Sequence, residues 1–165
     1  MDSFVHLHSH SEYSLLDGAA RLTDEKGKPG ELLKRIADMK MPALAITDHG
    51  NLYGAIEFYQ AAKAVNVKPI IGCEMYLAPK SRLDRDSTRG QEDAYYHFGL
   101  LARDNEGYQN LIQLCSIGFL EGYYYKPRVD KEVLAKHGKG LIALSGCLKG
   151  ELAQALLAGK DKEDV

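Results

Sequence analysis

The chain has 165 residues, of which 45% are hydrophobic and 27% are charged, and its formal net charge is −2. This composition is typical of a soluble globular protein with one ordinary domain and a real core. The charge balance excludes a global basic field that would bind nucleic acid by neutralising phosphates, but a local basic groove stays open. No apolar run is long enough to span a bilayer, and the first residues show no signal-peptide pattern.

The cysteines indicate a reducing environment. Cys73, Cys115 and Cys147 are odd in number and widely spaced, so they form neither a disulfide framework nor a CxxC zinc knuckle. We therefore expect a cytoplasmic protein with reduced thiols.

The first predicted element is a strand over residues 4–8 that carries an unusual histidine pattern. His6, His8 and His10 stand at every second position. Because a strand sends alternate side chains to the same face, we expect the three imidazoles to point the same way. Burying several imidazoles leaves ring nitrogens to satisfy, and a metal ion removes that cost. The pattern favours a metal-binding strand over the alternative, an exposed polar strand face.

The following elements predict a parallel α/β architecture. Tight β-α-β-α-β connections of this kind are typical of parallel sheets with crossover helices. In chain order we expect a loop over 10–20, a helix over 29–40, a buried apolar strand over 43–47, a helix over 53–65 and a strand over 68–77.

A charged segment over 80–93 interrupts this order, and we expect it to be a mobile excursion at the surface. The pattern then predicts a strand over 95–102, a helix over 105–120, an aromatic and basic loop over 122–130, a short helix over 131–136, a strand over 140–145 and a helix over 150–158. No strand follows the last helix, so we expect an unfinished barrel or sheet.

Side chains that bind transition metals collect near the ends of the predicted strands, where parallel α/β folds place their reactive groups. Three of them have other interpretations: His49 as a capping partner of Asp48, Glu74 as a solvent-facing residue and Cys147 as a small buried side chain. His97 stands near the start of its strand. That strand either runs opposite to the others or leaves His97 in a loop that dips into the site.

Seven candidate ligands exceed the four that a structural zinc site needs, and so predict a cluster of two or more metals. They are His8, His10, Asp17, His49, Glu74, His97 and Cys147. Mixed imidazole, carboxylate and thiolate ligands suit zinc, manganese or iron. Such clusters polarise phosphoryl oxygens and activate water, so we expect metal-assisted hydrolysis of a phosphoester.

Six segments of the chain resemble the PHP (polymerase and histidinol phosphatase) domain, in the form found at the N-terminus of the alpha subunit of bacterial DNA polymerase III. They are HLHSHSEYSLLDGAA, PALAITDHGNLYGAIEFY, KPIIGCEMYLA, GYQNLIQL, EGYYYKPRVD and GLIALSGCLKGEL. The resemblance implies a distorted (β/α)7 barrel, of which residues 1–165 would be the N-terminal portion of a single domain. It also implies two to three bound metal ions.

Carried over by motif, the resemblance implies that His8 and His10 are the leading ligand pair, and that they act in catalysis through the metal together with His49. Asp17, Glu74, His97 and Cys147 match further ligand positions. The resemblance places His6 and Asp48 beside the ligands as supporting residues. The family's final Asp-x-His pair would lie beyond residue 165.

The resemblance implies that the chain is part of a DNA-directed DNA polymerase and acts as a 3′–5′ exonuclease that proofreads DNA. The alternative is a structural, metal-stabilised module that braces the polymerase and docks a separate exonuclease subunit. Tyr125, Lys126 and Arg128 are candidate DNA contacts, or else pack against the barrel. Implied partners are DNA, the sliding clamp and the clamp loader, with no membrane. Nucleotide addition, with magnesium, would need residues outside this chain.

Overall fold

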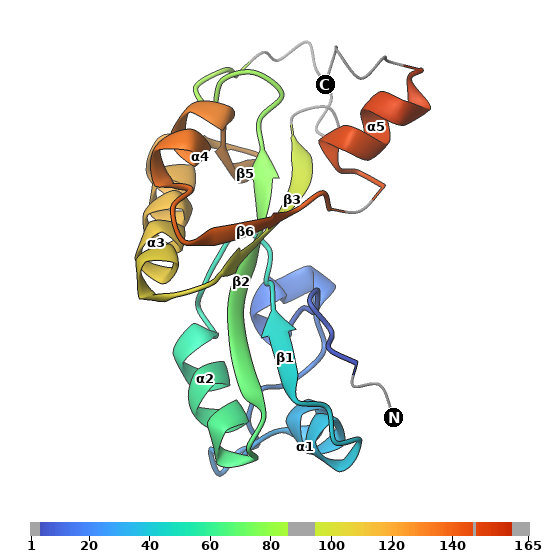
Figure 1. Cartoon of the computed structure of the whole chain (residues 1–165). Coiled ribbons are helices and arrows are strands. Elements are labelled where there is room, and N and C mark those ends of the chain that lie inside the picture. The colour runs from blue at the N-terminus through green and yellow to red at the C-terminus, as the bar shows by residue number, and fades with distance from the viewer. Residues whose placement is uncertain (1–3, 86–94, 147, 160–165) are drawn as a thin grey trace. The chain divides into compact units, whose positions relative to one another are not determined.

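The computed structural model describes residues 4–85, 95–146 and 148–159. The chain divides into two compact units, Met1–Cys73 and Glu74–Val165. Each unit combines helices with strands, which confirms the predicted α/β class (Figure 1). The expectation of a wholly parallel sheet is wrong, because the second unit also contains antiparallel strand pairs. The predicted ligand Cys147 lies outside the described residues.

The first unit is built around a buried parallel strand pair. Its elements are η1 (Glu12–Asp17), α1 (Glu31–Asp38), β1 (Ala43–Ile46), α2 (Ala55–Ala64) and the start of β2 (Lys68–Leu77). Ala43 lies opposite Lys68 and Ile46 opposite Ile71 in a parallel register. All four residues of β1 are buried, as expected for a strand that is covered on both faces.

The predicted strand over 4–8 is wrong, because that segment is extended but makes only a single bridge. His6 lies opposite Leu44 in a parallel bridge, and its carbonyl accepts from the amide of Ala45 at 2.9 Å. The chain bends at Leu7, so the ladder does not continue. The predicted loop that follows contains the short 3-10 helix η1.

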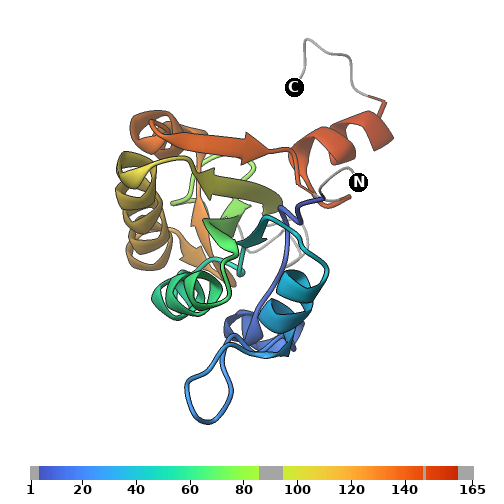
Figure 2. The same ribbon diagram turned by 60° about the horizontal axis from the view of Figure 1, so that its bottom comes forward.

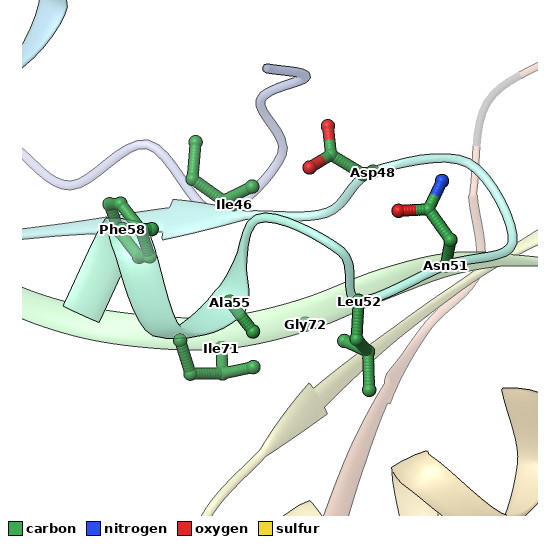
Figure 3. Close-up of a pocket in the computed structure, with 8 residues that line it drawn as sticks. All are labelled: Ile46, Asp48, Asn51, Leu52, Ala55, Phe58, Ile71 and Gly72. Carbon is green, nitrogen blue, oxygen red and sulfur yellow. The ribbon is translucent and has the colours of Figure 1, made fainter. Parts of the chain in front are cut away.

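A hydrophobic core fixes the helices of the first unit. Leu33 of α1 and Phe58 of α2 are fully buried and pack with Leu22, Leu44 and Val67. The loop between η1 and α1 projects from this unit in Figure 2 and is closed by hydrogen bonds between residues 24 and 28. Beside the core is a small pocket whose lining is mostly apolar, so it offers little chemistry of its own (Figure 3).

The second unit is a mixed sheet with helices packed on it. Its elements are the end of β2, β3 (Tyr96–Ala102), α3 (Asn105–Leu120), β4 (Tyr123–Tyr124), β5 (Lys126–Val129), α4 (Lys131–His137), β6 (Leu141–Leu144) and α5 (Glu151–Leu157). The strand order is β4-β5-β2-β3-β6. β2 and β5 are parallel, while β4 with β5 and β3 with β6 are antiparallel.

The sheet is open and not a closed barrel, since β4 and β6 stand at the two ends of the described strand order. β3 runs opposite to β2, which decides between the two interpretations of the strand that carries His97 (Figure 1). The predicted loop over 122–130 is instead a hairpin of β4 and β5, with Tyr125 at its turn at a φ of 60°. These strands are too short to show a clear alternation of apolar and polar side chains, and one of them contains a proline.

The start of the charged segment after β2 is held in place, contrary to the expected mobile excursion. The Arg82 guanidinium donates to Asp130 at 3.1 Å, and the Arg82 amide donates to the same carboxylate at 2.8 Å. Burial raises the pKa of Asp130, but hydrogen bonds from the Arg82 and Val133 amides and from the guanidinium outweigh it and hold this pKa below its ordinary value. Residues 86–94 lie outside the described part of the chain.

Arg128, a candidate DNA contact, is turned toward the protein backbone. Its side chain is buried, and its guanidinium donates to the carbonyl oxygens of Gly122, Arg82 and Asp84. These hydrogen bonds fasten the segment after β2 to the β4–β5 hairpin.

Candidate metal centre

The first unit brings three predicted ligands together. His10, Asp17 and His49 each offer a donor atom, and these atoms lie within 4.8 Å of one another. His49 Nε2 is 3.0 Å from Asp17 Oδ2, and the His10 and His49 rings stack with their centroids 4.2 Å apart. Two imidazoles and a carboxylate are a donor set that fits zinc, manganese or iron.

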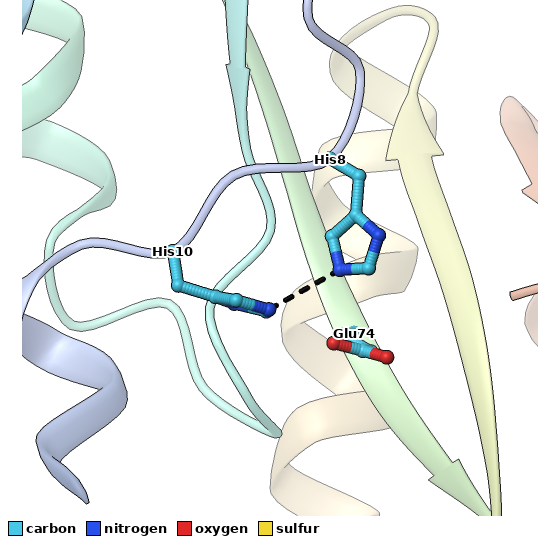
Figure 4. A group of neighbouring side chains, drawn as sticks. All are labelled: His8, His10 and Glu74. Atoms are coloured by element: carbon cyan, nitrogen blue, oxygen red, sulfur yellow. Dashed lines mark hydrogen bonds between the residues drawn. The ribbon is translucent and has the colours of Figure 1, made fainter. Parts of the chain in front are cut away.

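His8 adds a further imidazole to this group. Its Nε2 lies 3.2 Å from Nε2 of His10, so the two ring nitrogens face each other (Figure 4). The prediction that the imidazoles point toward the same side therefore holds for His8 and His10. His6 is exposed, and its ring instead packs edge-on against Phe4, with the centroids 4.8 Å apart.

The second unit contains a carboxylate–imidazole pair of its own. Glu74 of β2 accepts from, or shares a proton with, His97 of β3, and its Oε1 lies 2.6 Å from His97 Nδ1. Glu74 is only 2% exposed, so the interpretation that it faces solvent is wrong. The hydrogen bond fixes the orientation of the His97 ring, as a carboxylate does for many metal-binding histidines.

Asp48 organises the segment that carries the ligands of the first unit. Its buried carboxylate accepts from the Ser11 amide at 2.6 Å, the Ser11 hydroxyl at 2.7 Å and the Ser14 hydroxyl at 2.8 Å. The contacts of Asp48 with this segment therefore run through two serines that no sequence pattern singles out. Two isolated serines in HSEYS carry no periodic signal that would have identified them.

The same segment is fastened to α2 on its other side. The Tyr13 hydroxyl donates to Glu57 at 2.6 Å, and the Thr23 hydroxyl donates to the same carboxylate. The hydrogen bond with Glu57 raises the pKa of Tyr13, and burial adds to the effect. The segment from His10 to Asp17 is thus tied to the end of β1 by Asp48 and to α2 by Glu57.

A close backbone approach at Gly18 makes this segment sensitive to a single methyl group. A Cβ at Gly18 would lie 1.9 Å from the Ser11 carbonyl oxygen. Since Ser11 is hydrogen-bonded to Asp48, we expect Gly18→Ala to displace the neighbouring Asp17, to destabilise the chain by about 1–3 kcal/mol and to weaken metal binding. Thermal unfolding and zinc competition titrations measure both effects.

The matched control is Gly27→Asn, because a Cβ at Gly27 would have no neighbour within 4 Å and asparagine tolerates its positive φ. A Gly18→Ala variant with the melting temperature and the zinc affinity of the parent chain would contradict the prediction.

The chain is similar to known proteins over nearly its whole length. The PHP domain family matches residues 6–165. The alpha subunit of DNA polymerase III from Thermus aquaticus is 54% identical over 164 residues, which cover 98% of this chain and 13% of the subunit. The Deinococcus radiodurans subunit is 51% identical over 166 residues, which cover 97% of this chain and 12% of the subunit.

A solved structure of an amidohydrolase from Chromobacterium violaceum is similar with a TM-score of 0.45 and 23% identity, covering 70% of this chain and 33% of that one. Within the described residues, every helix is too short or too polar to cross a membrane. The chain spans about an eighth of the length of the polymerase subunits that it matches. On the match over residues 6–165, it belongs to the PHP domain family.

Proposed function

We propose that residues 1–165 form the N-terminal portion of a PHP domain in a bacterial DNA polymerase III alpha subunit, and that this domain is a metal-dependent phosphoesterase. The carrying observation is that donor atoms of His10, Asp17 and His49 lie within 4.8 Å of one another. The 54% identity to the Thermus aquaticus subunit supports the polymerase context. In the complete domain, the open sheet would be extended into the distorted (β/α)7 barrel of the family.

The proposed centre holds two to three zinc or manganese ions, with iron also compatible with the donor types. When bound, such ions polarise a phosphoryl oxygen and lower the pKa of a bound water to about 7. The proposed ligands are the seven side chains that the sequence predicts: His8, His10, Asp17, His49, Glu74, His97 and Cys147.

The chain's own residues hold and orient these donors. The Glu74 carboxylate fixes the His97 ring through a contact of 2.6 Å, and Asp48 fixes the segment of His10 through Ser14. Asp17 has 77% of its side chain exposed, so it stands on the side from which a substrate phosphate can approach.

The proposed substrate is the 3′ end of DNA, which the domain would shorten as a proofreading 3′–5′ exonuclease. Tyr125 is 46% exposed at the turn of the β4–β5 hairpin and would stack on a base. Lys126, whose amine lies 5.6 Å from the centroid of the Tyr76 ring, would contact the DNA backbone. Arg128 leaves the set of proposed DNA contacts, because its guanidinium already donates to backbone carbonyls.

A second candidate function is structural. In this alternative the domain binds metal for stability, braces the polymerase and docks a separate exonuclease subunit. The 54% identity to the Thermus aquaticus subunit supports this alternative, since it sets the domain beside a polymerase. Either function places the parent protein in the cytoplasm with DNA, the sliding clamp and the clamp loader, and leaves magnesium-dependent polymerisation to other parts of that protein.

The test is a cleavage assay on DNA labelled at its 3′ end, together with metal analysis. We expect purified protein to contain at least two metal ions per chain, to lose cleavage on chelation and to regain it with zinc or manganese. His8→Ala should lower both the metal content and the cleavage, while His137→Ala, at the end of α4, should change neither. Bound metal without cleavage under any metal would refute the hydrolytic function in favour of the structural one, and absence of metal would refute both.

A further inference from the structure

We propose that Ser14 is a positioning residue that selects the tautomer of His10 required for metal binding. This inference rests on the proposed metal centre. The Ser14 hydroxyl oxygen lies 2.8 Å from Asp48 Oδ1, 3.1 Å from the His49 amide nitrogen and 3.4 Å from His10 Nδ1. One nearly buried hydroxyl thus contacts the backbone of one proposed ligand and the ring of another.

The position of the hydroxyl proton follows from the partners. A serine hydroxyl has one proton to donate and two lone pairs to accept with. The Asp48 carboxylate is the charged and nearer acceptor, so it takes the proton of Ser14. The carboxylate is itself fixed by the amide and the hydroxyl of Ser11, which keeps it in place to accept.

The two lone pairs of Ser14 then face two donors. The His49 amide can only donate, so it occupies one lone pair. The other faces His10 Nδ1, and since the hydroxyl proton is already committed to Asp48, Nδ1 must carry the ring proton.

A proton on Nδ1 leaves the lone pair of neutral His10 on Nε2. Nε2 is the atom that faces Nε2 of His8 at 3.2 Å. Ser14 therefore presents the lone pair of His10 toward the neighbouring imidazole, where a shared metal ion would receive it. The relay from carboxylate through hydroxyl to imidazole does what a direct carboxylate–histidine contact does in other metal sites.

The same hydroxyl also ties the ring of His10 to the backbone of His49, so both proposed ligands depend on one oxygen atom. Loss of this oxygen frees the His10 ring to rotate and to take either tautomer. Fixing the tautomer and the ring orientation is the kind of support whose removal costs metal affinity.

The tautomer can be read directly in the metal-free chain. Two-bond proton–nitrogen NMR spectra of ¹⁵N-histidine at about pH 8.5, where an ordinary histidine is neutral, show which ring nitrogen carries the proton. We expect His10 to be protonated at Nδ1 in the parent chain. Ser14→Ala should give a mixture of tautomers, and Ser14→Thr, which keeps the hydroxyl, should restore the Nδ1 form.

Zinc affinity, measured by competition with a chelator, gives the second readout. Ser14→Ala should weaken zinc binding by roughly 10- to 100-fold, and Ser14→Thr should bind within a few-fold of the parent chain. The control is Ser116→Ala, which removes an exposed hydroxyl bonded to the Ile112 carbonyl in α3. It should change neither the His10 spectrum nor the affinity.

A proton on Nε2 of His10 in the metal-free parent chain overturns the proposal, and this result needs no variant to fold. Parent-like tautomer and parent-like zinc affinity in Ser14→Ala overturn it equally. Failure of the metal centre itself is a different result: the parent chain would bind no zinc, while the metal-free spectrum would still decide the role of Ser14.

Discussion

Asp130→Ala is expected to lower the free energy of unfolding by about 3–5 kcal/mol, because it breaks the buried part of the ion pairing of Arg82. The carboxylates that remain beside Arg82, those of Glu121 and Glu132, are more exposed. The Asp130 side chain is 3% exposed and the paired Arg82 side chain 13% exposed. The same carboxylate caps α4 by accepting from the Val133 amide at 3.1 Å and also holds the Arg82 amide. Urea unfolding followed by circular dichroism measures the loss.

Two matched variants separate the parts of this effect. Glu132→Ala removes a carboxylate that is 80% exposed and contacts the same Arg82, so we expect little change. Asp104→Ala removes the helix cap at the start of α3 and an exposed ion pair with Arg103, and should cost much less than Asp130→Ala. Equal losses for Asp104→Ala and Asp130→Ala would show that the buried ion pair contributes nothing.

His49→Ala is expected to weaken metal binding by more than about 100-fold, since even supporting residues of metal sites cost 10- to 100-fold when they are removed. His49 both faces Asp17 at 3.0 Å and stacks on His10. Its loss removes one donor and also the contacts that His49 makes with two others. Metal content after dialysis and zinc competition titrations measure the change.

The control for this variant is His6→Ala. His6 belongs to the same histidine run but is exposed and packs its ring against Phe4, so metal content and affinity should match those of the parent chain. A His49→Ala chain that retains the parent's metal content and affinity would remove His49 from the proposed ligand set. Equal losses of metal affinity in His6→Ala and His49→Ala would mean that the effect of His49→Ala does not come from removing a metal ligand.

The elements that could be predicted from sequence are those with long, clear periodicity. The predicted bounds of β2 and α3 agree with the structure, and the all-apolar composition of β1 correctly indicated a buried parallel strand. The strand predicted over residues 4–8 is wrong because alternating side-chain types do not ensure a continuous ladder of backbone hydrogen bonds. The β4–β5 hairpin was missed because its strands have two and four residues.

The candidate site was predictable in its donors but not in their support. Histidines and carboxylates are identifiable from sequence because few structural roles place so many of them at strand ends. Ser11 and Ser14 were missed because hydroxyls are common at every kind of loop. Arg128 was a candidate DNA contact because its neighbours in the sequence are basic and aromatic. Its guanidinium instead donates to backbone carbonyl oxygens, and backbone atoms leave no signature in a sequence.

The double fastening of the segment from His10 to Asp17 has a thermodynamic consequence. Ordering a free segment reduces affinity, because the lost conformational entropy must be recovered from the new contacts. Here Glu57 holds Tyr13 and Asp48 holds Ser14 within the folded chain itself. The entropy loss therefore accompanies folding. If the proposed ions bind, α2, which carries none of the proposed ligands, would help to set their affinity.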